Sequence, residues 1–214
     1  MDLVEADRPL VAQRQDAADG AKRRQIMDGA RAVFLAQGFD AASMGEIARR
    51  AGVSKGTLYV YFEDKQTLFD AIVQERCHIH AERVFEFDHT DHAVEEVLTR
   101  LGIDFATVMC RPENFSGVRA VIAIAERMPE LGRKFYETGP LLAINKLAAY
   151  LDAQVAAGVL VIEDTEIAAA QFIDAVLATL FKPMLFNYET ATPERIDYVV
   201  DIAVRMFMAA YRAR

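Results

Sequence analysis

The chain has 214 residues, a formal net charge of −8, 53% hydrophobic residues and 26% charged residues, which is typical of a globular protein rather than a disordered one. Its longest apolar run, AAAQFIDAVLATLF, contains Asp174 and is shorter than the roughly 20 residues that a membrane helix needs. The acidic start MDLVEADRPL is unlike a signal peptide, so we expect a cytoplasmic protein without a membrane partner.

Residues 1–19 are polar, mixed in charge and without a sustained apolar stripe, so we expect a flexible N-terminal arm there. The pattern changes after residue 20. Apolar residues fall at i, i+4, i+7 and i+8 from Ile26, which predicts a first helix that ends at Gly38.

Short, sharply bounded helices are predicted next. Ser43 and Glu46 have the spacing of a capping box, so a second helix follows Ser43 and stops at Gly52. Ser54 caps a third short helix, and a fourth begins near Lys65. A residue that tolerates positive φ between two helices with facing apolar positions indicates a helix-turn-helix. The alternative is a helical hairpin that only packs.

Polar and small side chains occupy the outward positions of the third predicted helix. Lys55, Thr57, Tyr59 and the hydroxyl edge of Tyr61 can donate to phosphates and base edges, and Gly56 and Thr57 are small enough to enter a major groove. This favours DNA recognition over a hairpin that only packs.

Apolar stripes continue beyond residue 88, with prolines and glycines between them. They predict helices at about 92–109, 115–127, 130–137, 140–157, 165–189 and 194–213. The short segment VLVIED is the one candidate for a strand. We therefore expect an all-α protein.

The charge is distributed unevenly along the chain. Residues 20–65 hold eight Lys and Arg against five Asp and Glu, whereas the remainder holds sixteen against twenty-seven. A small basic module on an acidic body is compatible with nucleic-acid contact, although a surplus of three charges is weak support by itself.

The segment IARRAGVSKGTLYVYFEDKQTLF, preceded by RRQIMDGARAVFLAQGFDAASM, resembles the N-terminal DNA-binding domain of TetR-type transcriptional regulators. RAVIAIAERMPELGRKFYETGP and the helix-rich sequence after it are similar to the AefR-like C-terminal domains of that family. The resemblance implies an all-helical homodimer whose first three helices bind DNA and whose body binds a small effector. The expected parts are an arm (1–19), a helix-turn-helix domain (20–66), and a ligand-binding and dimerisation domain (67–214).

The resemblance also implies which residues touch operator DNA. Those that would enter the groove are Lys55, Gly56, Thr57 and Tyr59, and those that would hold the DNA backbone are Ser43, Tyr61 and Lys65. Lys65 also suits a phosphate on physical grounds, because it stands where the free N–H groups of the fourth helix begin. Arg23 and Arg24 are weaker candidates that could equally be solvated.

The residues on segments that enclose the ligand cavity in relatives are Phe105, Met109, Met128, Phe135, Tyr136 and Phe172. Aromatic and Met linings suit an apolar or aromatic molecule, but residues of these types at helical spacing are more often core. The resemblance implies repression as the commoner mode, with effector binding shifting the fourth helix until the half-site distance no longer fits.

A homodimer is expected from the last two predicted helices without reference to the family. The final helix has an apolar stripe of Ile196, Val199, Val200, Ala203, Val204, Phe207, Met208 and Tyr211, and the helix before it is apolar around more than half of its circumference. This surplus predicts a four-helix bundle with a second subunit, whose two-fold symmetry would set two recognition helices about 34 Å apart.

All four histidines fall in the segment CHIHAERVFEFDHTDH. Cys77 with His80, and His89 with His92, have i, i+3 spacing, so a transition-metal site or a pH-sensitive hinge is conceivable. The commoner interpretation is a polar helix end with incidental histidines. Cys77 and Cys110 show no C-x-x-C spacing, which argues against a disulfide framework or a zinc ribbon.

Neither a phosphate-binding loop nor an H-E-x-x-H motif is present, so the sequence does not indicate an enzyme or a bound cofactor. A protein-interaction module remains the alternative, and it would lack the salt-dependent DNA affinity of a DNA reader.

Overall fold

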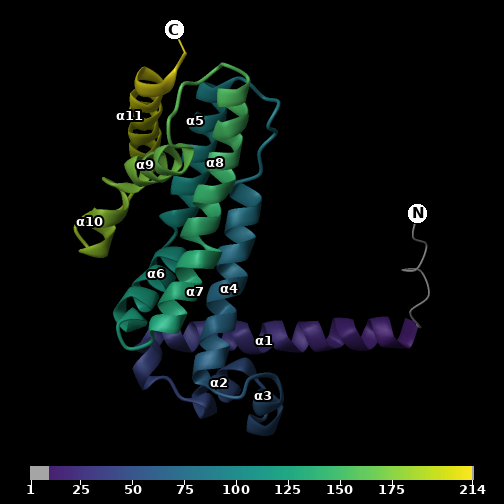
Figure 1. Ribbon diagram of the computed structural model, residues 1–214. Helices are drawn as coiled ribbons and strands as arrows, with labels where there is room; N and C mark the ends of the chain where they lie inside the picture. The colour runs from purple at the N-terminus through teal and green to yellow at the C-terminus, as the bar shows by residue number, and fades with distance from the viewer. Residues whose placement is uncertain (1–9, 214) are drawn as a thin grey trace. The chain divides into compact units, whose positions relative to one another are not determined.

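Helices account for nearly all of the regular structure. The computed structural model describes the backbone of residues 10–213 and the side chains of residues 19–75, 84–112 and 114–213. Within these bounds the helices (Figure 1) are α1 (Leu10–Ala41), α2 (Met44–Ala51), α3 (Lys55–Tyr61), α4 (Lys65–Val84), α5 (Val94–Met109), α6 (Pro112–Ala125), α7 (Pro129–Thr138), α8 (Pro140–Ala156), α9 (Thr165–Leu177), α10 (Phe181–Leu185) and α11 (Pro193–Tyr211). The described backbone has no strand, and VLVIED contributes an isolated bridge between Leu160 and Arg212. The all-α prediction is confirmed.

Helix α1 differs from the prediction at its start. It begins at Leu10, so the second half of the expected flexible arm is helical, and the first half lies outside the described residues. Of residues 10–19, seven are Ala, Gln, Leu or Arg, which are good helix formers even without an apolar stripe. At Gly38 the backbone leaves the helical region with φ 78° and ψ 169°, where the sequence predicted the end of the first helix.

The long helix predicted at 165–189 is interrupted. Helix α9 ends at Leu177, and the short α10 follows from Phe181 to Leu185. Pro183 lies within α10, and a proline has no N–H to donate and clashes with the preceding turn. This explains why an apolar stripe that continues through the segment does not give one continuous helix.

The chain divides into two compact units, Met1–Val73 and Gln74–Arg214. In the first unit, α2 and α3 lie on the same side of α1 (Figure 1), and α1 packs closely against α2. The core of this unit includes Ile26, Ile47 and Leu58, each fully buried. The unit extends beyond the predicted boundary at residue 66 because the first turns of α4 are buried in it, with Phe69 in ring contact with α1.

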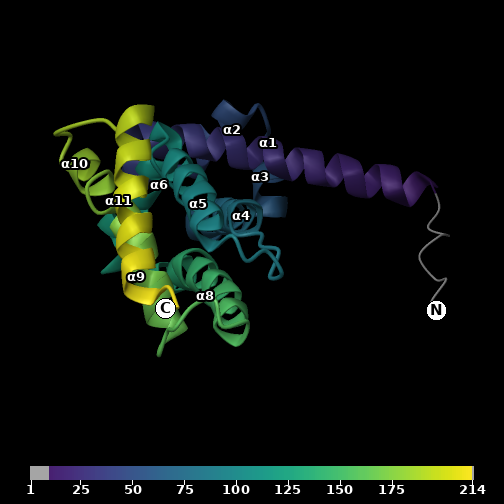
Figure 2. The same cartoon turned by 90° about the horizontal axis from the view of Figure 1, so that it is seen from above.

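The second unit is built around α5, α8, α9 and α11. Figure 2 shows α11 beside both α5 and α9, and α8 beside α9, in agreement with the contacts between these helices. The fully buried side chains at their centre include Leu98, Leu147, Val176 and Val200. Within the described part of the chain, no helix is long and apolar enough to cross a membrane.

A buried polar network fastens the loop between α4 and α5 to α8. Gln154 is fully buried. Its Nε2 donates to the carbonyl of His89 at 3.1 Å, and its Oε1 accepts from His92 Nδ1 at 2.7 Å. Tyr150, also fully buried, donates to the carbonyl of Asp91 at 2.8 Å. Burial raises the pKa of Tyr150 to about 12, so its hydroxyl remains a donor at neutral pH.

The apolar stripe of α11 is used within the protomer. Every residue of the predicted stripe from Ile196 to Met208 is buried, and Tyr211 is half-buried against the same core. The apolar surface of α11 that the sequence suggested was left for a second subunit is therefore covered by α5 and α9 of the same protomer. A different line at i, i+4 and i+8 remains at the surface, with Tyr198 57% exposed, Ile202 half-buried and Met206 63% exposed.

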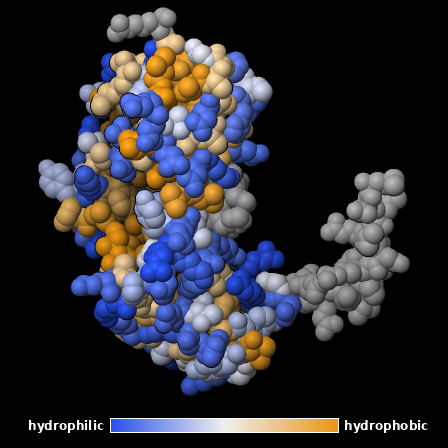
Figure 3. Space-filling view, viewed as in Figure 1, coloured by the Kyte–Doolittle hydropathy of each residue, from blue (hydrophilic) through white to orange (hydrophobic). Residues whose placement is uncertain are grey.

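Other exposed apolar side chains lie near α9 and α10. Ile167 is 55% exposed, and Phe186 and Tyr188 are more than four-fifths exposed. Figure 3 shows apolar residues gathered on the visible face of the second unit around α10. Large contiguous apolar patches on a protein surface mark interaction sites, so these residues are candidates for contact with a partner.

Gly102 sets how closely α5 and α11 approach one another. A Cβ at this position would lie 2.8 Å from one methyl of Val200 and 3.2 Å from the other. We expect Gly102→Ala to lower the free energy of unfolding by about 1–3 kcal/mol through overpacking. Gly117→Ala is the matched control, because nothing lies within 4 Å of its Cβ position and alanine should raise helix stability by up to about 1 kcal/mol. Urea unfolding of both variants measures the difference; equal stabilities would contradict the close approach.

Candidate functional site

The start of α2 is fixed by a reciprocal cap. The hydroxyl of Ser43 accepts from the backbone N–H of Glu46 at 3.3 Å and donates to the Glu46 carboxylate at 3.0 Å. The bond from Ser43, with a second from Gln37, lowers the pKa of Glu46. Ser43 is exposed, as a DNA-backbone contact requires, but its hydroxyl already has partners within the domain.

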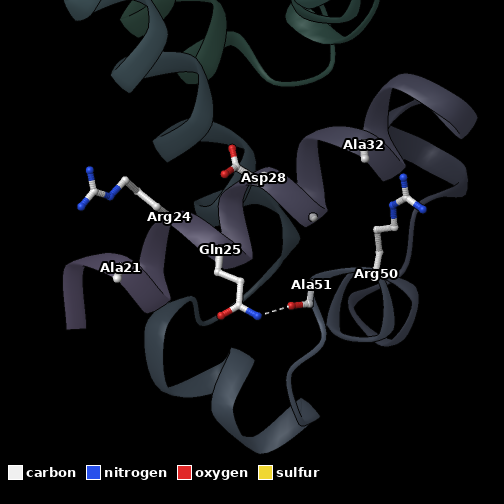
Figure 4. A pocket seen from close by; sticks show the side chains of 8 residues that line it. Ala21, Arg24, Gln25, Asp28, Ala32, Arg50 and Ala51 are labelled. Atoms are coloured by element: carbon white, nitrogen blue, oxygen red, sulfur yellow. Dashed lines mark hydrogen bonds between the residues drawn. The ribbon is translucent and has the colours of Figure 1, made fainter. Parts of the chain in front are cut away.

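The turn between α2 and α3 depends on Gly52, which has φ 66° and ψ 35°. This left-handed conformation is strained for residues with a Cβ, and from it the Gly52 N–H reaches the carbonyls of Ala48 and Arg49. Helix α1 supports the same turn, because Gln25 Nε2 donates to the carbonyl of Ala51 at 2.7 Å (Figure 4). The predicted helix-turn-helix is therefore present.

Helix α3 is held by its cap and by one buried side chain. The Ser54 hydroxyl accepts from the backbone N–H of Thr57 at 3.0 Å and lies 2.8 Å from the Thr57 hydroxyl. Leu58 is fully buried. The Thr57 hydroxyl thus already has one hydrogen-bond partner in the cap, and the Thr57 side chain is half-buried.

The outward side of α3 forms a compact exposed face, which we call the reading face: Lys55, Gly56, Tyr59 and Val60. Tyr59 is 52% exposed and Val60 is 80% exposed. Lys55 extends back over α2, where a Cβ at Gly45 would lie 3.0 Å from its Cε. The reading face therefore presents the ammonium of Lys55, the phenol of Tyr59, the two methyl groups of Val60 and, at Gly56, backbone that carries no side chain.

Val60 was not among the sequence-predicted contacts. It lies four residues after Gly56 on the same side of the helix, so helical periodicity placed it on this face. An exposed valine beside an exposed tyrosine is suited to the methyl group of thymine.

Two predicted backbone anchors make contacts within the domain. The Tyr61 hydroxyl donates to the carboxylate of Asp19, and this bond raises the pKa of Tyr61. Lys65 donates its ammonium to the carbonyls of Phe39, Asp40 and Ala42. Asp19 was missed because its segment was assigned to the flexible arm. The Tyr61 hydroxyl and the Lys65 ammonium therefore do not join the reading face as free hydrogen-bond donors.

The two arginines considered at the first helix differ in their surroundings. The guanidinium of Arg23 lies 5.2 Å from the ring centre of Phe62, and its Nη1 lies 3.2 Å from the sulfur of Met27. Arg24 is exposed and, with Gln25, Asp28 and Arg50, lines an open groove of about 700 Å³ between α1 and α2 (Figure 4). Arg24 is thus the freer of the two cations.

The six residues predicted to line an effector site fall into three environments. Phe172 is buried in the core, and Phe105 packs beside that core, 5.3 Å from the ring of Phe85. Tyr136 is 52% exposed. The half-buried members are Met109, Met128 and Phe135, at the end of α5 and around α7.

The histidine segment does not support a metal site or a pH-sensitive hinge. The side chains of Cys77 and His80 lie outside the described residues. His89 and His92 lie in a loop where Asp88 accepts from the Thr90 N–H at 2.9 Å, so their helical spacing was a wrong premise. Among the described side chains, no group of three or more His, Cys, Asp or Glu could hold a metal ion.

A capped helix-turn-helix with an exposed reading face, joined to a separate helical unit, defines a two-domain helix-turn-helix regulator. Residues 26–72 match the model of the bacterial regulatory proteins of the tetR family, and residues 96–213 match that of the AefR-like transcriptional repressor C-terminal domain. The chain belongs to the TetR family of bacterial transcriptional regulators, whose members are regulators and not enzymes.

The curated relatives align with this chain over only part of its length. The chain is 35% identical over 103 residues to the HTH-type transcriptional repressor BepR of Brucella suis, an alignment that covers 44% of this chain and 48% of BepR. It is 42% identical over 55 residues to the HTH-type transcriptional repressor Rv1474c of Mycobacterium tuberculosis, which covers 26% of this chain and 29% of that protein. The chain thus spans less than half the length of these relatives.

Solved structures match over most of the chain. A TetR-family transcriptional regulator from Mesorhizobium loti has 28% identity and a TM-score of 0.79, covering 91% of this chain and 98% of that one. The flavonoid-responsive regulator FrrA has 32% identity and a TM-score of 0.78, covering 91% and 99%. Both likenesses extend through the two units and support the family assignment.

The cap of α3 is expected to contribute to the stability of the domain. Ser54→Ala removes the acceptor for the Thr57 N–H and should lower the free energy of unfolding by about 1 kcal/mol. Ser116→Ala is a suitable control, because the Ser116 hydroxyl donates back to the Pro112 carbonyl of its own helix in a solvent-exposed hydrogen bond, whose loss is close to neutral. Denaturant unfolding followed by circular dichroism compares the two, and a Ser54→Ala variant as stable as the control would contradict the capping role.

Proposed function

We propose that this protein is a transcriptional repressor that binds a palindromic operator as a homodimer and leaves it when a small apolar or aromatic effector binds the second unit. The observation that carries the proposal is the reading face on α3, which is exposed and polar, on a helix positioned by Ser54 and the Gly52 turn. Relatives named as repressors support the mode of action.

The reading face has the chemistry that DNA recognition requires. Lys55 supplies a cation and Tyr59 a hydroxyl for phosphates or base edges, while Gly56 lets the helix approach the groove closely. We propose Lys55, Gly56, Tyr59 and Val60 as groove contacts. Thr57 would contribute through its methyl group or its remaining hydroxyl lone pair. Ser43 and the exposed Arg24 are the proposed backbone contacts.

A second copy is the proposed partner of the exposed apolar line on α11. Tyr198, Ile202 and Met206 lie on one side of this helix, and Ile167 of α9 is also exposed. Two-fold pairing through α9 and α11 would bury these side chains and present two reading faces to a palindrome. Dimerisation is typical of the family and fits this arrangement.

The proposed effector site lies in the second unit near Met109, Met128 and Phe135. These side chains are half-buried and lie outside the main hydrophobic cluster, so a ligand can cover them without displacing the core. Met and Phe adapt to flat apolar molecules. The responsiveness of FrrA to flavonoids supports an aromatic effector.

Operator preference should depend on Tyr59 and Thr57. We expect Tyr59→Ala and Thr57→Ala each to reduce operator affinity relative to unrelated DNA by about 1–3 kcal/mol, because base-edge contacts are lost. Tyr136→Ala is the matched control, since Tyr136 and Tyr59 are both 52% exposed. The assay is a mobility shift on DNA fragments selected by affinity from the source genome.

In that assay the unchanged chain should bind with two protomers for each half-site pair and lose affinity steeply as salt rises. Binding without sequence preference, or equal effects of Tyr59→Ala and Tyr136→Ala, would refute the assignment of the reading face.

Effector binding should stabilise the folded protein. A flavonoid at one hundred times its dissociation constant should raise the free energy of unfolding by about 2.7 kcal/mol, measured as a thermal shift, and should release the operator. Phe135→Ala should diminish this shift, whereas Phe186→Ala should not, because Phe186 is 82% exposed on another segment. A panel of flavonoids that produces neither a shift nor release would refute this effector class.

A further inference from the structure

Asp19 joins the unpredicted beginning of α1 to the end of α3. The Tyr61 hydroxyl, 42 residues away in sequence, donates a hydrogen bond to the Asp19 carboxylate. Asp19 is exposed and Tyr61 is half-buried, so this bond lies at the surface of the first unit. The carboxylate also raises the pKa of Tyr61, which keeps the hydroxyl protonated and able to donate.

The same side of α1 makes a second contact with the end of α3. Arg23 lies one helical turn after Asp19, and its guanidinium is 5.2 Å from the ring centre of Phe62. Phe62 caps α3 by donating its N–H to the Leu58 carbonyl, and its side chain is buried. Helix α1 thus meets the end of α3 at two consecutive residues, which holds the Asp19 carboxylate in place beside the phenol of Tyr61.

Tyr61 lies at the end of α3 that would come close to the DNA backbone. Helix α3 has seven residues, which corresponds to a length of about 10 Å, and the major groove is about 12 Å wide. When the reading face sits in the groove, the last residue of α3 therefore lies near a wall of phosphates. Tyrosine hydroxyls are among the usual donors to phosphate oxygens.

A carboxylate and a phosphate present the same kind of acceptor to the Tyr61 hydroxyl, a negatively charged oxygen. A phenol carries one proton, which it donates to one such acceptor at a time. A phosphate therefore gains this hydroxyl only when the bond to Asp19 breaks. The released carboxylate remains on an exposed residue, so the exchange leaves no buried charge behind.

We propose that Asp19 limits the affinity of this protein for DNA by holding the Tyr61 hydroxyl in the free protein, and that a DNA phosphate takes its place in the complex. This inference rests on the proposed DNA-binding function. Because a phosphate contact carries no direct sequence information, Asp19 lowers the affinity for all DNA alike and leaves operator preference unchanged. Two other roles predict different results: a carboxylate that orients Tyr61 for DNA, and a carboxylate that repels DNA by its charge alone.

A double-mutant cycle separates these three roles. The full-length unchanged chain, Asp19→Ala, Tyr61→Phe and the double variant are titrated on the selected operator and on shuffled DNA at one salt concentration, after circular dichroism has confirmed that they are folded. We expect Asp19→Ala to raise the affinity for both DNAs about three- to tenfold. In the Tyr61→Phe background, where there is no hydroxyl to release, the same substitution should change the affinity by less than about twofold.

Two further variants complete the experiment. Glu63→Ala is the matched control for charge, because Glu63 is an exposed acidic residue two positions after Tyr61; it should change the affinity by the same factor in the unchanged chain and in Tyr61→Phe. Asp19→Asn keeps an acceptor oxygen but removes the charge, so it should give a smaller gain than Asp19→Ala. It also provides the test should Asp19→Ala not fold.

Lower or unchanged affinity in folded Asp19→Ala would overturn the inference, since the carboxylate would then orient Tyr61 or have no role in binding. An equal gain with and without the Tyr61 hydroxyl would also overturn it, because repulsion by charge alone would explain both values. If the unchanged chain binds the operator and shuffled DNA equally, the proposed function fails, yet the cycle on shuffled DNA still decides the role of Asp19. A chain that binds no DNA defeats both.

Discussion

The close contact between α1 and the end of α2 is the constraint on which the DNA-binding unit depends. A Cβ at Gly29 would lie 2.7 Å from the backbone of Ala51, so the two helices meet at a point where α1 has no side chain. Gln25 closes the same contact by donating to Ala51. Gly52 then turns the chain into α3. The contacts at Gly29 and Gln25 and the turn at Gly52 together fix the orientation of α3, so that its reading face points outward from the unit.

Polar side chains in this unit divide into two groups. Ser43, Ser54, Tyr61 and Lys65 satisfy caps, a carboxylate and backbone carbonyls within the unit. Lys55 and Tyr59 remain exposed on α3. A small domain with free helix ends must satisfy them locally, and much of the polar composition around the turn serves that purpose. The positive surplus of residues 20–65 is therefore only partly available to DNA.

The sequence was most informative where local chemistry determines structure. Ser43 with Glu46, Gly52 and Ser54 identified the helix-turn-helix, because capping and positive φ have strong residue preferences. It was least informative where tertiary contacts decide. The ammonium of Lys65 bonds to carbonyls that are distant in sequence. The apolar stripe of α11 packs against α5 and α9, and helical periodicity alone cannot distinguish such a stripe from a dimer face. Pro183 showed that one apolar run need not be one helix.

The central claim is that α3 reads operator DNA through its reading face. A crystal structure of the protein with its selected operator tests this most directly. The account predicts Lys55, Tyr59 and Val60 against base edges in the major groove. A complex in which α3 lies away from the groove, or in which none of these three side chains meets a base edge, would contradict it.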